Sequence, residues 1–183
     1  IRVLRFLENM FVYFSKFIRM LSDADVTVVP RGAGTGLSGG ALAGANSVVI
    51  GTARMNRILK LDPENRLALV QSGVVNADLS AAASPFGLYY APDPSSQSAC
   101  TLGGNVAENS GGPHCLKYGV TSRYVTGLTV VTHDGTVLDL GGFGRELGSY
   151  DLVGVLVGSE GCFGLVTEIE VRLLPRPEGV RTI

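Results

Sequence analysis

The sequence predicts an α+β fold, and three observations support this. Short β-branched runs at 26–29 and 47–50 read as buried strands. Turn residues at 62–65 and 133–135 each separate two such runs and indicate hairpins. Glycine makes up 25 of the 183 residues, about twice the usual share of roughly 7%, which indicates many tight loops. The length is that of one ordinary domain or slightly more.

The first 21 residues are predicted to form a helix, because apolar residues recur at helical spacing. These are Val3, Leu7, Met10, Phe14, Phe17 and Leu21. The segment is basic, but its longest apolar run, 10–14, is far shorter than the ~20 residues that cross a bilayer. We expect this helix to pack on the core. The alternative is a helix on a membrane surface. The expected location is therefore cytoplasmic, with peripheral contact with the inner membrane as the alternative.

After the strand at 26–29, the residues from Pro30 to Gly40 must form a loop, and a strand follows at 47–50. Strands at 58–61 and 67–71 flank the turn Asp62-Pro63-Glu64-Asn65 and are predicted to pair.

A short helix is predicted over 77–83, with Asn76 as its N-cap and its end before Pro85. A second stretch rich in glycine, serine, proline and asparagine covers 91–112.

In the last third of the chain, the sequence predicts a hairpin of strands 124–132 and 136–140 around the turn Asp134-Gly135. Ser149 is the expected cap of a helix over 150–157 that stops at Gly158, and 165–173 alternates like a strand.

Charge and composition exclude several classes of protein. Fifteen basic and 16 acidic residues give a net charge of −1, which argues against a nucleic-acid partner. Three cysteines without a CxxC pair exclude a disulfide framework or zinc ribbon and fit a reducing compartment. With only two histidines, we expect no metal site.

The loop after the first strand is the strongest local signal for a ligand. It contains Gly32, Gly34, Gly36, Gly39 and Gly40, and such clusters turn backbone N–H groups inward around an anion, usually phosphate. Residues 34–39 fit GxGxxG and residues 36–40 fit GxSxG. Both motifs require a following helix, and a strand resumes by Ser47 instead. A Rossmann nucleotide site and a serine hydrolase are therefore disfavoured.

The second glycine-rich stretch has similar chemistry. Gly103 and Gly104 lead into an expected helix start at Asn105, where free N–H groups favour an anion. Two such cradles fit a pyrophosphate. Glu160 is a candidate acceptor for a ribose hydroxyl, with a solvated loop charge as the alternative. His114 is a candidate proton carrier, against a hydrogen-bonded loop histidine.

Three separated segments, 30–41, 91–119 and 150–161, resemble the FAD-binding domain of the vanillyl-alcohol-oxidase/PCMH flavoprotein family. The likeness is greatest to the flavin subunit of glycolate oxidase and to D-lactate dehydrogenase-like FAD-linked oxidases. The resemblance implies two small α+β subdomains with one FAD between them. It implies cofactor contacts at Arg31, Gly32, Ala33, Gly34, Thr35, Gly36, Ser38, Gly39, Gly40, Pro92, Asp93, Pro94, Ser95, Thr101, Leu102, Gly103, Gly104, Asn105, Asn109, Ser110, Gly111, Gly112, Glu160, Gly161 and Val166.

Within that set, the resemblance gives each part of the cofactor its own residues. The first loop would hold the pyrophosphate, and 92–95 with 101–105 would line the flavin and phosphates. Residues 109–112 would lie near the isoalloxazine, and Glu160, Gly161 and Val166 along the adenosine half. Some members attach FAD through a histidine in the first loop. Thr35 stands there, so we expect non-covalent FAD.

The implied chemistry is oxidation of a small 2-hydroxy acid, glycolate or D-lactate, by hydride transfer to flavin N5, with electrons passing on to an acceptor. The alternative is a non-catalytic flavin-binding subunit or gene remnant that needs a partner chain. A nicotinamide-binding domain and a MurB-like reductase are further alternatives, the latter disfavoured by the segment 113–119.

We expect three parts: an atypical N-terminal helix (1–21), the FAD-binding domain (22–177), and the start of a linker (178–183). In the family, a cap domain follows that carries substrate-binding arginine and histidine residues and a metal site. Turnover by this chain alone should therefore be poor, and His114 is the one candidate here for a catalytic base.

Overall fold

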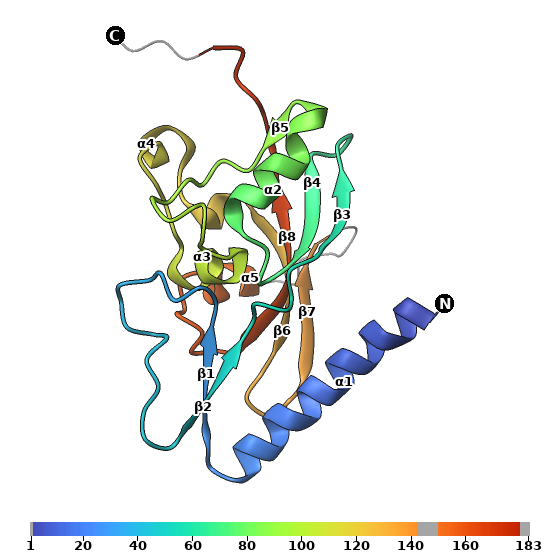
Figure 1. Cartoon of the computed structure of the whole chain (residues 1–183), viewed down its shortest axis with the longest axis vertical. Helices are drawn as coiled ribbons and strands as arrows, with labels where there is room; N and C mark the ends of the chain where they lie inside the picture. Colours follow the sequence, from blue (N-terminus) through green and yellow to red (C-terminus); the bar gives the residue numbers. More distant parts are fainter. Residues whose placement is uncertain (1, 143–149, 180–183) are drawn as a thin grey trace.

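A five-stranded antiparallel sheet and a separate parallel pair of strands form the frame of the molecule (Figure 1). The structure is a computed structural model that describes residues 2–142 and 150–179, with side chains described from Tyr13 onward. The prediction of an α+β fold is confirmed.

The large sheet has the order β3-β4-β8-β6-β7, and each neighbouring pair is antiparallel. Its strands are β3 (Ile58–Asp62), β4 (Leu67–Gln71), β6 (Val125–Val131), β7 (Val137–Gly141) and β8 (Leu165–Arg172). Alternate side chains of the three central strands point into the main core, because neighbours along a strand face opposite sides. These are Ala68, Val70, Leu128, Val130, Ile169 and Val171.

Three short helices cover that face of the sheet (Figure 1): α2 (Asn76–Ala83), α3 (Leu102–Glu108) and α5 (Leu152–Leu156). Leu79 from α2 and Leu102 from α3 are fully buried in the same core. The segments that connect these helices contain the 3₁₀ turns Ser84–Phe86 and Thr121–Arg123 and the short helix α4 (Cys115–Tyr118). They also contain β5 (Leu88–Tyr89), which pairs with β9 (Leu174–Pro175).

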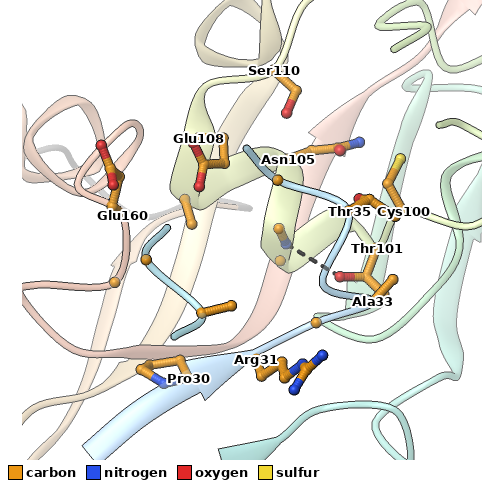
Figure 2. A pocket seen from close by; sticks show the side chains of 18 of the residues that line it. Pro30, Arg31, Ala33, Thr35, Cys100, Thr101, Asn105, Glu108, Ser110 and Glu160 are labelled. Atoms are coloured by element: carbon orange, nitrogen blue, oxygen red, sulfur yellow. Dashed lines mark hydrogen bonds between the residues drawn. The ribbon is translucent and has the colours of Figure 1, made fainter. Parts of the chain in front are cut away.

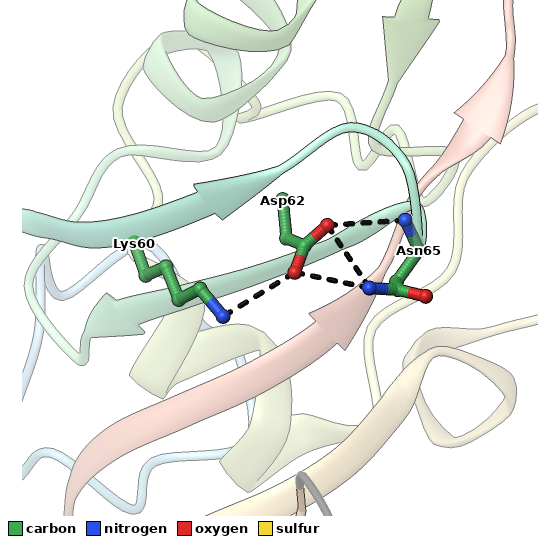
Figure 3. A network of polar contacts seen from close by, with 3 residues as sticks. All are labelled: Lys60, Asp62 and Asn65. Atoms are coloured by element: carbon green, nitrogen blue, oxygen red, sulfur yellow. Dashed lines mark hydrogen bonds and ion pairs between the residues drawn. The ribbon is translucent and has the colours of Figure 1, made fainter.

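Both predicted hairpins are present, β3–β4 and β6–β7. Figure 3 shows the first turn, where Asp62 accepts from the backbone N–H of Asn65 at 3.1 Å and from its side-chain amide. Lys60 Nζ lies 3.3 Å from the same carboxylate. These contacts, the Asn65 backbone bond first, lower the pKa of Asp62, so the turn keeps its anion at ordinary pH.

The parallel pair consists of β1 (Thr27–Arg31) and β2 (Ser47–Gly51). Parallel strands need a long crossover, which is usually a helix. Here the crossover is the glycine loop itself, and residues 32–46 contain no helix or strand. A small second core of Ile50, Val131 and Leu165 joins this pair to the large sheet.

The N-terminal helix α1 (Arg2–Asp23) packs on that second core through Phe14 and Ile18. Ser15 Oγ donates to the carbonyl of Gly135, and Arg19 Nε donates to the carbonyl of Asp134 at 2.8 Å, so α1 is also tied to the β6–β7 turn. The described half of the helix thus packs on the core, as we expected. Among the described residues, none of the helices combines the length and apolar character needed to cross a membrane.

Two predicted caps differ from the structure. Asn76 is the first residue of α2 and not its cap; its Nδ2 donates instead to the carbonyl of Pro92 at 2.9 Å. The helix expected over 150–157 is shorter. Asp151 caps it by accepting from Gly154 N at 2.8 Å, and Ser149 lies outside the described residues. Asp is as good a cap as Ser, so sequence alone did not separate the two positions.

Candidate functional site

A cavity of about 450 Å³ lies between the glycine loop, α3 and the segment 159–161 (Figure 2). This volume is within the range of small-molecule sites, roughly 300–1,000 Å³. Residues of the loop after β1 line one side of the cavity, and residues of α3 and of 159–166 line the others.

The glycine loop forms the first wall. No N–H group of residues 32–41 has a hydrogen-bond acceptor among residues 2–142 and 150–179. Gly34 has a φ of 72° and Gly39 of 92°, conformations that side-chain-bearing residues rarely adopt. The loop therefore carries a run of backbone donors, as the sequence predicts for an anion cradle.

The start of α3 forms the second wall and differs from the prediction. The helix begins at Leu102 and not at Asn105, because Thr101 is the N-cap, its Oγ1 accepting from Gly104 N at 3.2 Å. Leu102 N donates to Val74 O, and Gly103 N donates to Ser72 O at 2.7 Å. The expected free N–H groups at this helix start are thus already taken by the protein.

Glycine serves a different purpose at this wall, namely close approach of backbones. A Cβ at Gly103 would lie 2.8 Å from Ser72 Cβ and 2.9 Å from its carbonyl oxygen. A Cβ at Gly32 would lie 2.4 Å from Thr101 Oγ1. Both glycines let the loop and β4 approach α3 more closely than any larger residue would.

Asn105 presents an unused donor beside the cavity. The residue is only 1% exposed, it lines the cavity (Figure 2), and its Nδ2 has no hydrogen-bond partner in the part of the chain that the structure describes. Buried amide groups are almost always paired, so this donor indicates a place for a ligand acceptor. Cys100 lines the cavity next to it, and burial raises the pKa of this thiol.

Two carboxylates, those of Glu108 and Glu160, form the opposite side (Figure 2). Glu108, the last residue of α3, accepts from Ser38 Oγ at 2.6 Å and so joins α3 to the glycine loop. Glu160 lies next to Gly40, where a Cβ would be 3.5 Å from Glu160 Oε2. Carboxylates only accept hydrogen bonds, so this side fits hydroxyl donors rather than phosphates.

The structure brings most of the predicted site residues together around this cavity. Those that line it are Arg31, Gly32, Ala33, Gly34, Thr35, Gly36, Gly40, Pro94, Thr101, Gly103, Gly104, Asn105, Asn109, Ser110, Gly111, Glu160, Gly161 and Val166.

The other predicted residues do not line it: Ser38, Gly39, Pro92, Asp93, Ser95, Leu102 and Gly112. Leu102 is fully buried in the main core, and Pro92 is buried behind α2. Gly112 packs on Asp93, whose carbonyl oxygen would lie 2.2 Å from a Cβ there. Ser38 contacts the site through Glu108 only.

His114, the candidate base, belongs to a second cavity of about 880 Å³ and does not line the first. Its Nδ1 lies 2.5 Å from Asp93 Oδ2. Lys117 and Tyr118 line the same cavity, and hydrogen bonding with Tyr89, then with Lys117, lowers the pKa of the Tyr118 hydroxyl. No cluster of three or more His, Cys, Asp or Glu residues suited to a metal occurs in the described ranges.

Several lining residues were not predicted: Pro30, Leu37, Ala41, Thr52, Ser72, Ser96, Cys100, Ala107, Glu108, Leu156, Ser159, Gly164 and Leu165. Glu108 is the important omission. Glu108 lies at the end of α3, three residues beyond Asn105. With the helix start known to be Leu102, this position would have indicated that Glu108 lies near the same site.

Comparison with known proteins agrees with this geometry. Residues 14–141 match the family model described as "FAD binding domain". The chain is 51% identical over 158 residues to the glycolate oxidase subunit GlcD of Escherichia coli strain K12, covering 86% of this chain and 32% of that protein. It is 41% identical over 164 residues to the D-lactate dehydrogenase of Anaerostipes hadrus, covering 89% and 34%.

A solved structure of alkyldihydroxyacetonephosphate synthase superposes with a TM-score of 0.80 at 26% identity, covering 90% of this chain and 30% of that one. The chain spans about a third of the length of the curated relatives it matches.

Proposed function

The chain belongs to the FAD-binding domain family, and we propose that it is the flavin-binding part of an oxidoreductase that converts a small 2-hydroxy acid, glycolate or D-lactate, to the 2-oxo acid. Homology to FAD-linked oxidoreductases is established by the relatives, which include a glycolate oxidase subunit and a D-lactate dehydrogenase. Glycolate and D-lactate share the α-hydroxy carboxylate group, so one chemistry serves both.

The observation that carries the proposal is the run of N–H groups without acceptors in residues 32–41. FAD has a diphosphate, which these donors would hold together with Arg31. The buried donor of Asn105 would meet an acceptor of the flavin, and Glu108 and Glu160 would accept from ribose hydroxyls. The diphosphate, an acceptor of the flavin and the ribose hydroxyls would each meet a complementary group on the cavity wall.

Attachment of FAD is proposed to be non-covalent. Thr35 lines the cavity where some members of the family have a linking histidine, and no histidine is among the residues found to line it. Cys100 also lines the cavity, and its raised pKa keeps it as the weakly reactive thiol.

When bound, FAD would supply the two-electron oxidant that takes a hydride from the α-carbon of the acid, whose hydroxyl would lose its proton. The residues of this chain that line the cavity would bind and orient the cofactor. We propose that groups binding the substrate carboxylate, and the electron acceptor, come from a further domain or a partner chain, because the relatives are about three times as long.

The test begins with the visible absorption spectrum of the purified chain, before and after denaturation and filtration. Flavin bands that pass into the filtrate support bound, non-covalent FAD. A colourless protein that also fails to take up added FAD contradicts the proposal.

Anaerobic addition of glycolate or D-lactate then tests the reaction. Bleaching of the flavin band by either acid, and not by ethylene glycol, which lacks the carboxylate, supports the oxidase assignment. Stable flavin without bleaching, even with the remaining domain or partner supplied, favours the alternative of a non-catalytic flavin-binding subunit.

A further inference from the structure

Two segments form one end of the proposed flavin cavity. The first follows Ala91, and its residues Pro94 and Ser96 line the cavity. The second follows α3, and its residues Asn109, Ser110 and Gly111 line the cavity. The width of the cavity at this end therefore depends on how far apart these two segments are held.

Each segment is anchored to a different part of the protein. Asn76 of α2 holds the first through the carbonyl of Pro92. The second is held by the turn that follows it, where Thr121 donates to Ser110 O at 2.7 Å and Ser122 N to Asn109 Oδ1 at 2.9 Å.

A side-chain pair joins the two segments directly. His114 Nδ1 lies 2.5 Å from Asp93 Oδ2. Next to it, Gly112 lies against Asp93, and a Cβ at 112 would be 2.2 Å from Asp93 Oδ1 as well as from its carbonyl oxygen. The segments are thus in contact at a point immediately behind Pro94 and Gly111 of the cavity wall.

We propose that Asp93 and His114 form a clamp that fixes the spacing of these two segments and so positions the bound flavin. This inference rests on the proposed FAD site. It makes His114 a positioning residue and not the base that takes the substrate proton. Through this pair His114, which does not line the cavity, would influence the cofactor by way of the segment that carries Asp93.

The geometry favours a local rather than a global role. The side chain of His114 is 65% exposed and that of Asp93 21% exposed, and exposed ion pairs add little to folding stability. With Nδ1 occupied by Asp93 and the ring outside the cavity lining, His114 lies poorly placed for proton transfer inside the cavity. Losing the pair should therefore loosen the cavity end while the fold stays intact.

The experiment compares FAD affinity, measured by quenching of flavin fluorescence, in the full chain and in H114A, D93N and the double variant. We expect each single variant to bind FAD about fivefold more weakly and the double variant to be no worse, because both remove one shared contact. H133A is the matched control, since His133 lies exposed in the β6–β7 turn, and it should bind like the original chain.

The variant H114R separates a clamp from a base. Arginine offers N–H groups that can donate to Asp93, but it stays protonated at neutral pH and so cannot accept a proton as a base. Under the clamp, H114R restores both the FAD affinity and the position of the flavin absorption band. The melting temperature of the cofactor-free chain should be the same in all these variants.

Two results would overturn the clamp. One is FAD affinity and a flavin spectrum in H114A that equal those of the original chain. The other is an H114R variant that binds FAD normally but whose flavin is no longer reduced by substrate when the remaining domain or partner chain is supplied. That result would make His114 the base. Failure of the original chain to bind FAD is a different outcome, which rejects the proposed function together with the clamp.

Discussion

In the loop after β1, the N–H groups of residues 32–41 have no acceptor among the described residues, whereas at the start of α3 those of Leu102, Gly103 and Gly104 are all bonded to the protein. Both regions are rich in glycine, and both were expected to cradle phosphate. In the first, glycine permits backbone conformations that expose donors. In the second, it removes a Cβ so that backbones can touch.

From this difference we expect a glycine cluster to hold an anion only where its N–H donors are unpaired. Binding of the FAD diphosphate should therefore depend on the first loop and not on the start of α3. The start of α3 should tolerate charge changes in the ligand and be sensitive to side-chain volume. The following substitutions test each half of that statement.

The largest effect is expected for Gly34→Asp. A Cβ at this position would lie 3.0 Å from Arg31 Nη2. The new carboxylate would therefore repel the diphosphate and would also pair with the Arg31 cation in its place. Two like charges ~4 Å apart near a protein surface repel by ~4 kcal/mol, so FAD binding should weaken at least about a hundredfold. Titration of flavin fluorescence measures this.

Gly34→Asn is the control, because it has the shape of Asp without the charge and both tolerate a positive φ. Equal losses in the two variants would mean that shape and not charge matters, and would break the assignment of the diphosphate to this loop.

The next largest effect is expected for Gly103→Ala. The added Cβ would meet the backbone of Ser72 at 2.9 Å, and such overpacking costs about 1–3 kcal/mol of unfolding free energy. Urea denaturation measures it. Gly104→Ala is the matched control in the same helix, where the nearest atom to a Cβ is Thr101 Oγ1 at 3.4 Å and alanine favours helix. A Gly103→Ala chain as stable as Gly104→Ala would remove the close-approach explanation.

A smaller effect is expected for Thr101→Ala. It removes the cap that accepts from Gly104 N, at a cost of about 1 kcal/mol of unfolding free energy. Thr101→Ser keeps the hydroxyl and should retain most of the stability. If FAD affinity fell while stability held, the Thr101 hydroxyl itself would contact the ligand at the start of α3, and the contrast between the two regions would fail.

The smallest effect is expected for Gly36→Ala in the first loop. This residue keeps its N–H, and its Cβ would meet only the flexible end of Glu108, at 3.2 Å. Stability should change by less than about 0.5 kcal/mol, the usual range for surface substitutions. A loss of FAD affinity greater than severalfold would show that this loop, too, depends on empty space and not only on its donors.

Local features of this molecule were predictable from sequence, and contacts between distant residues were not. The hairpins β3–β4 (58–71) and β6–β7 (125–141) follow from turn residues and alternation within one short stretch of sequence each. The cap of α3 was mistaken because glycines at 103 and 104 suggested a loop, whereas the helix tolerates them under tertiary packing. The Ser38–Glu108 contact joins residues 70 apart, and neither residue's neighbours in sequence indicate it.

The parallel pair β1–β2 is closed by a helix-free loop, and that loop also holds the donors proposed for the diphosphate. A ligand bound there restricts the crossover that connects the two strands, so cofactor occupancy and the persistence of this small sheet are thermodynamically linked. At a free FAD concentration of one hundred times Kd, the linkage adds about 2.7 kcal/mol to stability. In the cell, a larger supply of flavin would therefore slow proteolysis of the β1–β2 pair and its crossover loop.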